Sequence, residues 1–565
     1  MKDYQYYIKR IGEYGYVREV YYPIAKIVGL PYVKPDEIVV FETNQQGQVF
    51  SLAEDHVEVL LFSDQPVPIN SQVTRTDSYV SIPFDEAVLG TIIDPLGRSF
   101  FDQSGLKESS HSFEVDRDVR GIADRVRIQR PLLSGTSLVD LLIPLGKGQR
   151  ELVIGDRKTG KSSFLLTLIK KQIEEGSVVV YAAIGKKKSD IKKLQEFFEK
   201  EQLSHSCLIV ASDPFDSPSL IFLTPYTALS AAEYFSSLGR DVVLVFDDLS
   251  THAKFYREMA LLSGRFPGRD SYPGDIFFIH AKLLERGGNF KHPKKGEVSI
   301  SILPVVETIE ADLTGFIATN IMGMTDGHVF FDSDAYYKGR RPAVNISLSV
   351  TRVGRQTQTP LKREINREIT AFLANFEKMQ TFSHFGAELS EKVKTILKTG
   401  DRMQSFFDQH YTTIVPEEVQ LILISLIWLH TLDELPLEKI AELRIKLIEQ
   451  YKDEAKGKEM KEMMKSDTFH DHLLKVTKKK QEYLALIGVK PQAQSISSPA
   501  PVTPQQAASP TGTPGQTQPQ TTIQPTIPPT QSPQNPAEQE GKEQPQQKQN
   551  TSSAKENKTD KIKKK

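Results

Sequence analysis

The stretch RELVIGDRKTGKSS, residues 150–163, joins an apolar strand to a glycine-rich turn and then to the start of a helix. Two glycines separated by four residues and followed by a lysine and a hydroxyl residue fit the phosphate-loop pattern. Such glycines let the backbone aim its N–H groups inward, and the helix N-terminus adds partial positive charge for phosphates. The residues expected around a bound nucleotide are Gly155, Asp156, Arg157, Lys158, Thr159, Gly160, Lys161, Ser162 and Ser163. A plain strand-to-helix turn is the alternative.

Two residues of this turn and one distant acid have specific expected roles. Lys161 places a point charge on the β- and γ-phosphates of ATP or ADP, and Ser162 offers a hydroxyl ligand to Mg²⁺. A Mg²⁺ site also needs a carboxylate from a neighbouring strand, and DVVLVFDDLS, residues 241–250, ends its strand in Asp247 and Asp248. We expect Asp247 to contact the metal directly or through one of its ligands. For an acid pair at a strand end, a turn or helix cap is the alternative.

The residue that would activate water is absent from its expected place. Hydrolysis needs a group that orients or deprotonates water, and it commonly follows the strand after the phosphate-loop helix. That strand is SVVVYAAIG, residues 177–185, and three lysines follow it, Lys186 first. A protonated lysine cannot act as a base. Asp190 lies close by, at an expected helix start where capping is its expected role. The sequence therefore predicts nucleotide binding without hydrolysis.

Hydrophobic periodicity predicts an α/β protein with four regions. Short β-rich runs broken by Pro, Asn, Asp and Gly predict a small β-barrel within residues 1–80. Strands alternating with helices predict a parallel-sheet, P-loop nucleotide-binding domain over residues 81–371. Helical periodicity predicts a helical domain over residues 372–490. Residues 491–565 contain no Phe, Tyr or Trp and are rich in Pro and Gln, which predicts a disordered tail.

Composition excludes several classes of protein. The 565 residues carry 71 Lys and Arg against 72 Asp and Glu, so no global charge points to nucleic acid or to an anionic membrane. The lone Cys207 excludes an intrachain disulfide and fits a reducing cytosol. The N-terminus lacks the apolar segment of a signal peptide, and the longest apolar run, residues 419–430, is too short to span a bilayer. We expect a soluble cytoplasmic protein that binds no nucleic acid.

Many further motifs occur in a fixed order along the chain. They are EAVLGTIIDPLGR (86–98), GKGQRELVIGDRKTGKSS (146–163), LTPYTALSAAEYF (223–235), VFDDLSTHAKFYREMALL (245–262), FPGRDSYPGDIFFIHAKLLERGG (266–288), LPVVETIEADLTGFIATNIMGMTDG (303–327), YKGRRPAVNISLSVTRVG (337–354), FSHFGAELSE (382–391) and IVPEE (414–418). With these motifs the chain resembles the α subunit of the F1 part of F-type ATP synthases over most of residues 16–486. The resemblance implies a RecA-like central domain.

The resemblance also implies partners and a division of labour. In that family, α and β subunits alternate in a hexameric ring around a central shaft, the γ subunit. Catalysis takes place on β, and the nucleotide on α does not turn over. The catalytic β form has Glu where this chain has Lys186, and the usual α form has Gln there. The expected partners are therefore a β-type catalytic subunit and a γ-like shaft.

The family's α subunit also reaches across the ring with an arginine, and the matching residue here is Arg352 in LSVTRVG. We expect Arg352 at the end of a strand VNISLSV, residues 344–350, pointing out of its own domain. There it would stabilise charge on the neighbour's γ-phosphate, an effect of about 10³ to 10⁵ in rate for arginine fingers. Ser349 would support it. A solvated arginine beside Arg355 is the alternative.

Three departures from the family suggest a specialised lineage. The β-rich part of the sequence begins near residue 16, so we expect no N-terminal helical segment for docking a peripheral stalk. Lys158 replaces the usual Gln, within a more basic site. The Pro/Gln-rich tail is foreign to the energy-coupling enzyme and is expected to bind an unknown partner. These features resemble the F1-like ATPases of wall-less bacteria, the mycoplasmas, which serve surface or gliding machinery instead of, or as well as, proton-coupled synthesis.

Such a complex would lie at the inner face of the cell membrane, and this chain would meet the membrane only through it. Two other functions stay open at this point. One is a self-sufficient homohexameric ATPase that resembles secretion ATPases or the transcription-terminating helicase, although the lysines after residue 185 count against it. The other is a structural scaffold that interacts through its tail.

Overall fold

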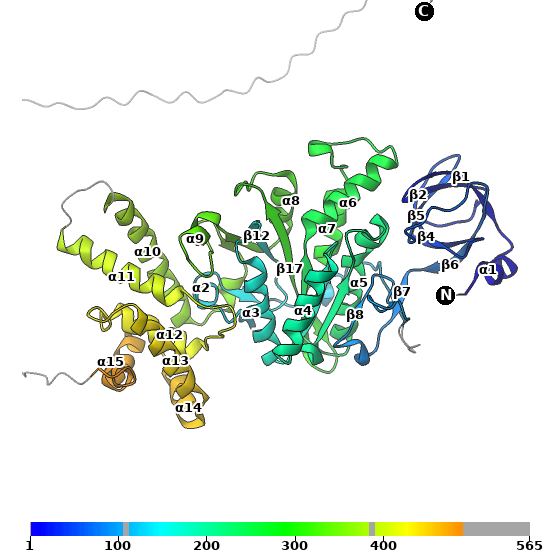
Figure 1. Ribbon diagram of the computed structural model, residues 1–565. Coiled ribbons are helices and arrows are strands. Elements are labelled where there is room, and N and C mark those ends of the chain that lie inside the picture. Colours follow the sequence, from blue (N-terminus) through cyan, green and yellow to red (C-terminus); the bar gives the residue numbers. More distant parts are fainter. Residues whose placement is uncertain (1, 106–111, 384–389, 490–565) are drawn as a thin grey trace, which may run out of the picture. The chain divides into compact units, whose positions relative to one another are not determined.

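The computed structural model describes residues 2–105, 112–383 and 390–489. These residues form an N-terminal barrel, a central sheet flanked by helices and a C-terminal set of helices (Figure 1). The predicted fold class is therefore confirmed for these three regions. The predicted tail, residues 491–565, lies outside the described residues, as do residues 384–389 of the FSHFGAELSE motif.

Six antiparallel strands close the barrel in the order β1-β2-β5-β4-β3-β6. They are β1 (Gly15–Tyr21), β2 (Ile24–Val28), β3 (Glu37–Phe41), β4 (Gln46–Leu52), β5 (Val57–Leu61) and β6 (Gln72–Tyr79). Valine, isoleucine and leucine side chains fill the interior, among them Val17, Val49 and Val59 with no exposed surface. Because the six strands close on themselves, the barrel has no edge strand that could pair with another chain.

A helix that the sequence analysis does not predict precedes the barrel. Helix α1 (Tyr4–Ile11) is capped by Asp3, whose carboxylate accepts from the Tyr6 N–H at 2.9 Å. Tyr4 and Tyr7 lie on one helical face and pack against Val40 of the barrel. These two tyrosines therefore anchor α1 on β3.

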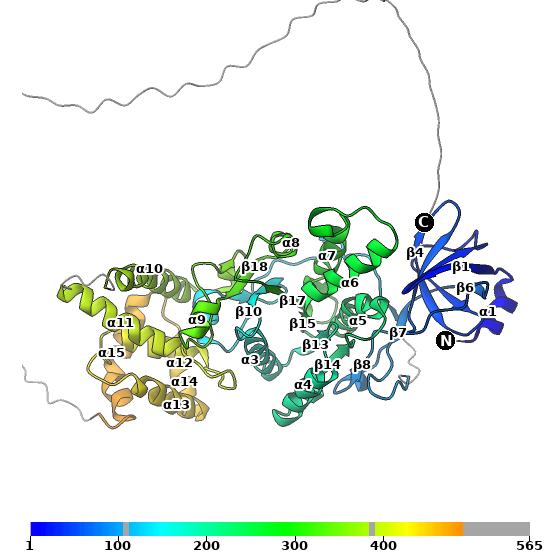
Figure 2. The same ribbon diagram turned by 45° about the horizontal axis from the view of Figure 1, so that its top comes forward.

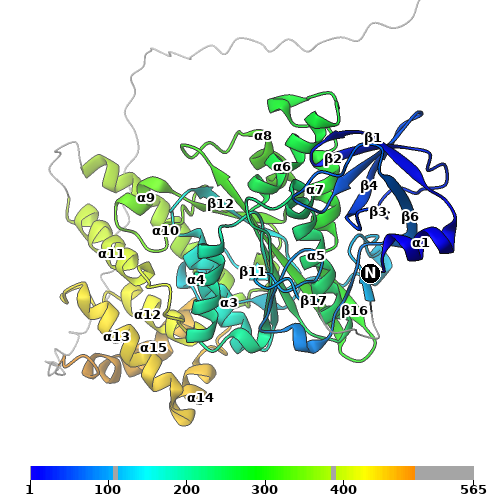
Figure 3. The ribbon, with the colours of Figure 1, turned by 45° about the vertical axis from the view of Figure 1, so that its right-hand side comes forward.

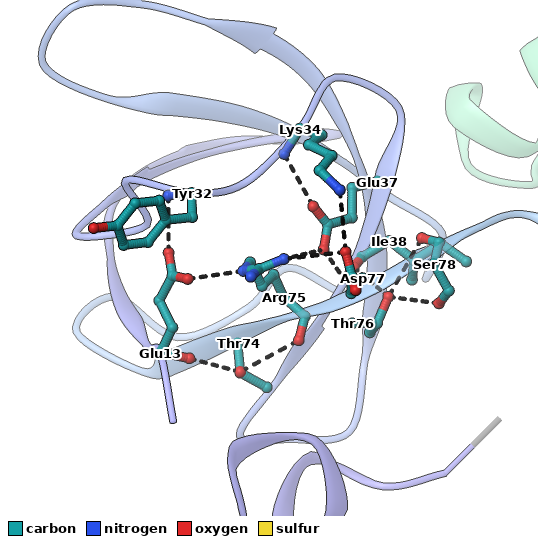
Figure 4. Close-up of polar contacts among 10 residues, drawn as sticks. All are labelled: Glu13, Tyr32, Lys34, Glu37, Ile38, Thr74, Arg75, Thr76, Asp77 and Ser78. Atoms are coloured by element: carbon teal, nitrogen blue, oxygen red, sulfur yellow. Dashed lines mark hydrogen bonds and ion pairs between the residues drawn. The ribbon is translucent and has the colours of Figure 1, made fainter. Parts of the chain in front are cut away.

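A buried carboxylate organises the barrel's polar cluster (Figure 4). Glu37 is 1% exposed, and it accepts backbone N–H groups from Lys34 at 2.9 Å and Asp77 at 2.6 Å. Arg75 lies 3.4 Å from Glu37 and donates to Glu13 at 2.7 Å. Because a buried charge is tolerated only when paired and hydrogen-bonded, these contacts fix the bulge where β3 meets β6.

The central sheet has the order β19-β18-β12-β17-β15-β13-β14-β8, with β16 paired to β17. Figure 2 shows β17, β15, β13, β14 and β8 in succession. The strands are β8 (Ile92–Ile93), β12 (Glu151–Asp156), β13 (Val178–Ala183), β14 (Cys207–Ala211), β15 (Val242–Asp247), β16 (Gly288–His292), β17 (Gly296–Thr308), β18 (Gly327–Phe331) and β19 (Val350–Thr351). Short two-stranded pairs join β7 (Ser81–Pro83) to β9 (Ser112–Glu114) and β10 (Pro131–Leu132) to β11 (Leu145–Gly146).

Both faces of the sheet are buried. Alternate residues of β12 belong to different clusters, with Val153 on the face covered by α3 and Leu152 and Ile154 on the face covered by α8 (Phe316–Met324). Near-continuous apolar strands are typical of parallel sheets covered on both sides. The helices of this domain are α2 (Ser137–Leu142), α3 (Lys161–Glu174), α4 (Lys188–Lys200), α5 (Pro218–Ser237), α6 (Leu249–Leu262), α7 (Ile276–Glu285), α8 (Phe316–Met324) and α9 (Ser333–Tyr337).

The C-terminal helices pack around one apolar helix. They are α10 (Pro360–Ser383), α11 (Glu391–Phe407), α12 (Glu417–Trp428), α13 (Glu438–Lys452), α14 (Glu454–Met463) and α15 (Phe469–Ala485). Figure 3 shows α11, α13 and α15 gathered around α12, in which every residue from 419 to 427 is buried. The long apolar run is thus a core helix, as predicted. Within the described ranges, none of the helices combines the length and the apolar character that a membrane crossing requires.

Two histidines lie fully buried between α6 and α7. His252 Nδ1 lies 3.2 Å from His280 Nε2, and His252 Nε2 contacts the Phe222 carbonyl at 3.1 Å. Their exposures are 0% and 1%. Burial lowers the pKa of His252 to about 4 and that of His280 well below 6.5, because the imidazolium form would lose its hydration.

This pair predicts acid-sensitive stability. The unfolded chain binds a proton on His252 below its ordinary pKa of 6.5, whereas the folded chain does so only near 4. The contribution of this pKa difference to the free energy of unfolding is therefore fully present above pH 6.5, and it is lost as the pH falls toward 4. From about pH 7 to about pH 5, urea unfolding should show a loss of about 2 kcal/mol from His252 alone.

The variant His252→Gln should flatten this pH dependence. The exposed His205 supplies the control, since His205→Gln should leave the pH profile of unfolding unchanged. An identical slope in the wild type and in His252→Gln would contradict the assignment.

Candidate nucleotide-binding site

The turn between β12 and α3 has the backbone that the sequence predicts. Gly160 and Lys158 lie in the left-handed region, with φ of 99° and 64°. Gly155 has φ of 152°, and a Cβ there would lie 2.3 Å from the Phe331 carbonyl oxygen of the neighbouring strand. Only glycine fits at Gly155, because that space is filled by the backbone of β18.

Residues 158–163 line a cavity of about 580 Å³ at the start of α3. Lys161 is 7% exposed, and its ammonium donates to the carbonyls of Gly155 at 2.8 Å and Asp156 at 2.6 Å. Burial lowers the pKa of Lys161, while the nearby carboxylates, Glu307 first, oppose that shift. The loop thus presents a desolvated cation at a helix N-terminus, the arrangement that binds phosphate.

Three of the nine predicted residues are not among those that line the cavity. Gly155 supplies a carbonyl, and the Asp156 carboxylate accepts from Thr308 at 2.5 Å, Ser333 at 2.9 Å and the Ala311 N–H at 3.0 Å. Asp156 therefore fixes the loop to β17 and α9. Arg157 is exposed and pairs with Glu307 at 2.7 Å.

The acid pair at the end of β15 has two different environments. Asp248 caps α6, accepting from the Thr251 N–H at 2.7 Å, so the capping alternative holds for Asp248. Asp247 instead lines the cavity together with Ser162, and its Oδ2 accepts from the Tyr181 hydroxyl at 2.7 Å. The cavity thus brings together the two predicted Mg²⁺ ligands, a hydroxyl and a carboxylate, although both carboxylate oxygens already have partners within the protein. Among the described residues no group of three or more His, Cys, Asp or Glu could hold a metal.

Lys186 also lies in this cavity. Its Nζ lies 2.9 Å from Asp247 Oδ1 and 3.1 Å from Asp248 Oδ2. Burial opposes its charge, but the two carboxylates raise the pKa of Lys186 above its ordinary value. Lys186 is therefore a fixed cation and cannot accept a proton from water.

The expected capping role of Asp190 is wrong. Helix α4 begins at Lys188 with Lys187 in the cap position, so Asp190 lies inside the first turn. Its carboxylate accepts from Lys193 at 3.2 Å. The helix starts three residues earlier than a cap at Asp190 would require, and an acid in the first turn suits the helix dipole instead.

The sequence analysis missed a carboxylate in the cavity. Glu307 ends the apolar part of β17, lines the cavity and pairs with Arg157. Its N–H donates to Ser250 at 2.9 Å, which joins β17 to the start of α6. The signal was present in the sequence, because LPVVE is an apolar strand ending in an acid, as DVVLVFD is.

The far end of the cavity comes from segments far apart in the sequence. It is lined by Tyr336, Arg341, Pro342, Gln409, His410 and Tyr411. The Arg341 guanidinium lies 3.7 Å from the centre of the Tyr336 ring, and the Tyr411 carbonyl accepts from Thr167 of α3 at 2.6 Å. Flat aromatic and guanidinium groups of this kind suit a nucleotide base. No local pattern links these residues, so the sequence analysis did not find them.

Arg352 lies at the opposite end of β12 from the phosphate loop. The ladder pairs Glu151 with Gly327 and Gly327 with Thr351, whereas Gly155 pairs with Phe331. Four strand residues thus separate the two ends, about 13 Å at the usual rise. The guanidinium is exposed, and it makes no hydrogen bond or ion pair with any residue that the structure describes.

The strand expected over residues 344–350 is wrong in length, because β19 contains only Val350 and Thr351. Ser349 instead braces the preceding turn. Its hydroxyl donates to the Asn345 carbonyl at 2.6 Å and accepts from the Phe330 N–H at 3.0 Å. Ser349 therefore holds β18 against the segment that leads to Arg352 but does not hydrogen-bond to the guanidinium itself.

Comparison with known proteins assigns the family. Residues 135–351 match the ATP synthase alpha/beta family, nucleotide-binding domain, and residues 358–482 match the ATP synthase alpha/beta chain, C terminal domain. An ATP synthase subunit alpha 2 from Nitrosospira multiformis is 36% identical over 433 residues, which cover 76% of this chain and 84% of the relative. An ATP synthase subunit alpha from Dictyoglomus turgidum is 36% identical over 449 residues, covering 79% and 88%. Together with the phosphate loop on the central sheet, these matches show that the chain is a nucleotide-binding member of the ATP synthase alpha/beta family, of the alpha-subunit type.

Proposed function

We propose that this chain is the non-catalytic, nucleotide-binding subunit of a heterohexameric F1-like rotary ATPase. It binds ATP or ADP with Mg²⁺ and lends Arg352 to the catalytic site of an adjacent β-type subunit. The observation that carries this proposal is that the phosphate loop and Arg352 lie toward opposite ends of strand β12. The phosphate loop follows one end of β12, and an exposed, unpaired arginine lies beside the other.

Eight residues around the cavity have definite roles in this proposal. Lys161 and the N-terminus of α3 bind the phosphates, and Ser162 and Asp247 would hold Mg²⁺. When bound, the metal would neutralise phosphate charge. The nucleotide base would be enclosed by Tyr336, Arg341, His410 and Tyr411. Lys186 stands where a proton-accepting side chain would have to act on water, so the bound nucleotide is kept intact.

The remaining parts of the proposal concern partners and place. The chain alternates with β-type subunits around a γ-like shaft, and the complex lies in the cytoplasm against the inner face of the membrane. The specialised lineage of surface or gliding machinery is the variant that we favour, because the sequence carries Lys158, Lys186 and a long Pro/Gln-rich tail together. Purifying the native complex and identifying its subunits by mass tests all of these points, including the partner of the tail.

Nucleotide binding depends on Lys161. Lys161→Ala should weaken ATP binding at least about tenfold in calorimetry, because one phosphate-binding charge is lost. The exposed Lys192 on α4 supplies the control, and Lys192→Ala should bind ATP as the wild type does. If ring assembly survives in Lys161→Ala while binding is lost, the two functions are separable; unchanged ATP affinity would contradict the site.

Turnover by the assembled ring depends on Arg352. In a ring with its β-type partner, Arg352→Ala should lower the ATP hydrolysis rate by about 10³-fold or more, while this chain's own ATP affinity stays unchanged. Arg355→Ala is the matched control, since Arg355 is exposed three residues away. Equal losses in both variants, or full activity in Arg352→Ala, would refute a specific role in trans.

Glu307 favours one second candidate, a self-sufficient ATPase. It is a carboxylate on this chain's own cavity, although it already forms an ion pair with Arg157 at 2.7 Å. We expect the purified chain to hydrolyse ATP negligibly and Glu307→Gln to leave that rate unchanged. Steady hydrolysis by the chain alone that disappears in Glu307→Gln would replace the proposed function with this second one.

A further inference from the structure

The cavity carries its own cation, Lys186, at the point where Asp247 of the cavity wall and the buried Asp248 behind it converge. Lys186 Nζ bridges Asp247 and Asp248 at 2.9 Å and 3.1 Å, and the side chain is only 26% exposed. Asp248 is itself fixed by capping α6 through Thr251. Because both acceptors belong to fixed elements, the ammonium cannot leave without depriving two largely buried carboxylates of their cation.

We propose that Lys186 takes over much of the task of a divalent cation, so that this chain binds nucleoside diphosphates and triphosphates with little dependence on Mg²⁺. The inference rests on the proposed nucleotide site and adds its ion requirement. Elsewhere in phosphate-loop sites, the metal offsets the charge of the phosphates beside an acidic strand end. Here a side chain already offsets the acids.

The charges that line the cavity support this inference. The lysines are Lys158, Lys161 and Lys186, and Arg341 adds a fourth cation, against the carboxylates of Asp247 and Glu307. Both carboxylates are already paired, Asp247 with Lys186 and Glu307 with Arg157. Lys161 and Arg341 donate to backbone carbonyls and form no direct ion pair with an acid among the described residues, so both remain available to a polyphosphate.

Oxygen ligands for a divalent ion are correspondingly reduced. Asp247 Oδ1 meets the Lys186 ammonium, and Asp247 Oδ2 accepts from the Tyr181 hydroxyl at 2.7 Å. Mg²⁺ dehydrates reluctantly and needs oxygen ligands in near-octahedral order. An ion near Asp247 would also face the positive charge of Lys186 in a partly desolvated cavity. Its contribution to nucleotide affinity is therefore small.

The experiment compares nucleotide affinity with and without the ion. The full chain is titrated with ATP and with ADP by calorimetry, once in excess Mg²⁺ and once in excess EDTA. For the wild type, the two dissociation constants should agree within about threefold. This measurement needs no variant, so it decides the point even where a substitution impairs folding.

Two variants identify the residue responsible. Lys186→Gln removes the built-in cation and should bind ATP at least about tenfold more tightly in Mg²⁺ than in EDTA. Lys187→Gln is the matched control, because Lys187 is exposed and does not line this cavity, and it should behave as the wild type does.

A wild-type affinity that falls about tenfold or more in EDTA overturns the inference and leaves the proposed nucleotide site intact. Equal Mg²⁺ dependence in Lys186→Gln and Lys187→Gln also overturns the role of Lys186. Absence of ATP binding under both conditions overturns the proposed function itself and this inference with it.

Discussion

Parallel pairing of β12, β17, β15 and β13 brings the carboxyl ends of these strands to one edge of the sheet. At or just beyond those ends lie Asp156, Glu307, Asp247 and Lys186. Asp156 and Glu307 are 151 positions apart in the sequence. Hydrogen bonds between fully buried strands fix this edge, and the apolar faces leave no freedom to slide by one residue. The cavity is therefore a product of strand order.

The same pairing explains why the two proposed functions do not mix. A residue at the start of β12 and a residue at its end cannot reach the same ligand, because a strand is extended and stiff. Arg352 is adjacent to the start of that strand through β18 and β19. A chain built in this way can act on its own nucleotide through one edge and on a neighbour through the other.

Local patterns predicted what is local. The phosphate loop, the barrel, the parallel sheet and the apolar helix α12 follow from spacing and periodicity, because each depends on neighbours in sequence. The capping assignment of Asp190 failed, since the helix begins three residues earlier than expected, and α1 was missed because tyrosines obscured its amphipathic face. The length of β19 was overestimated, because the turn that Ser349 braces interrupts the alternating pattern.

Tertiary assembly produced what the sequence could not give. Glu307 resembles Asp247 in its local setting, but only strand order places both on one cavity. His410 and Tyr411 reach the far end of the cavity from the segment between α11 and α12, a location that no spacing rule predicts.

The contacts of Asp156 have a consequence for how fast a nucleotide exchanges. Its carboxylate accepts hydrogen bonds from Thr308, Ala311 and Ser333, so two other segments, the end of β17 and the start of α9, hold the phosphate loop in shape. The conformational entropy of the loop is lost when the chain folds, so ligand binding does not have to order the loop again. Preorganisation of this kind slows dissociation more than it changes association. Slow exchange is what the proposed non-catalytic role would require of this site.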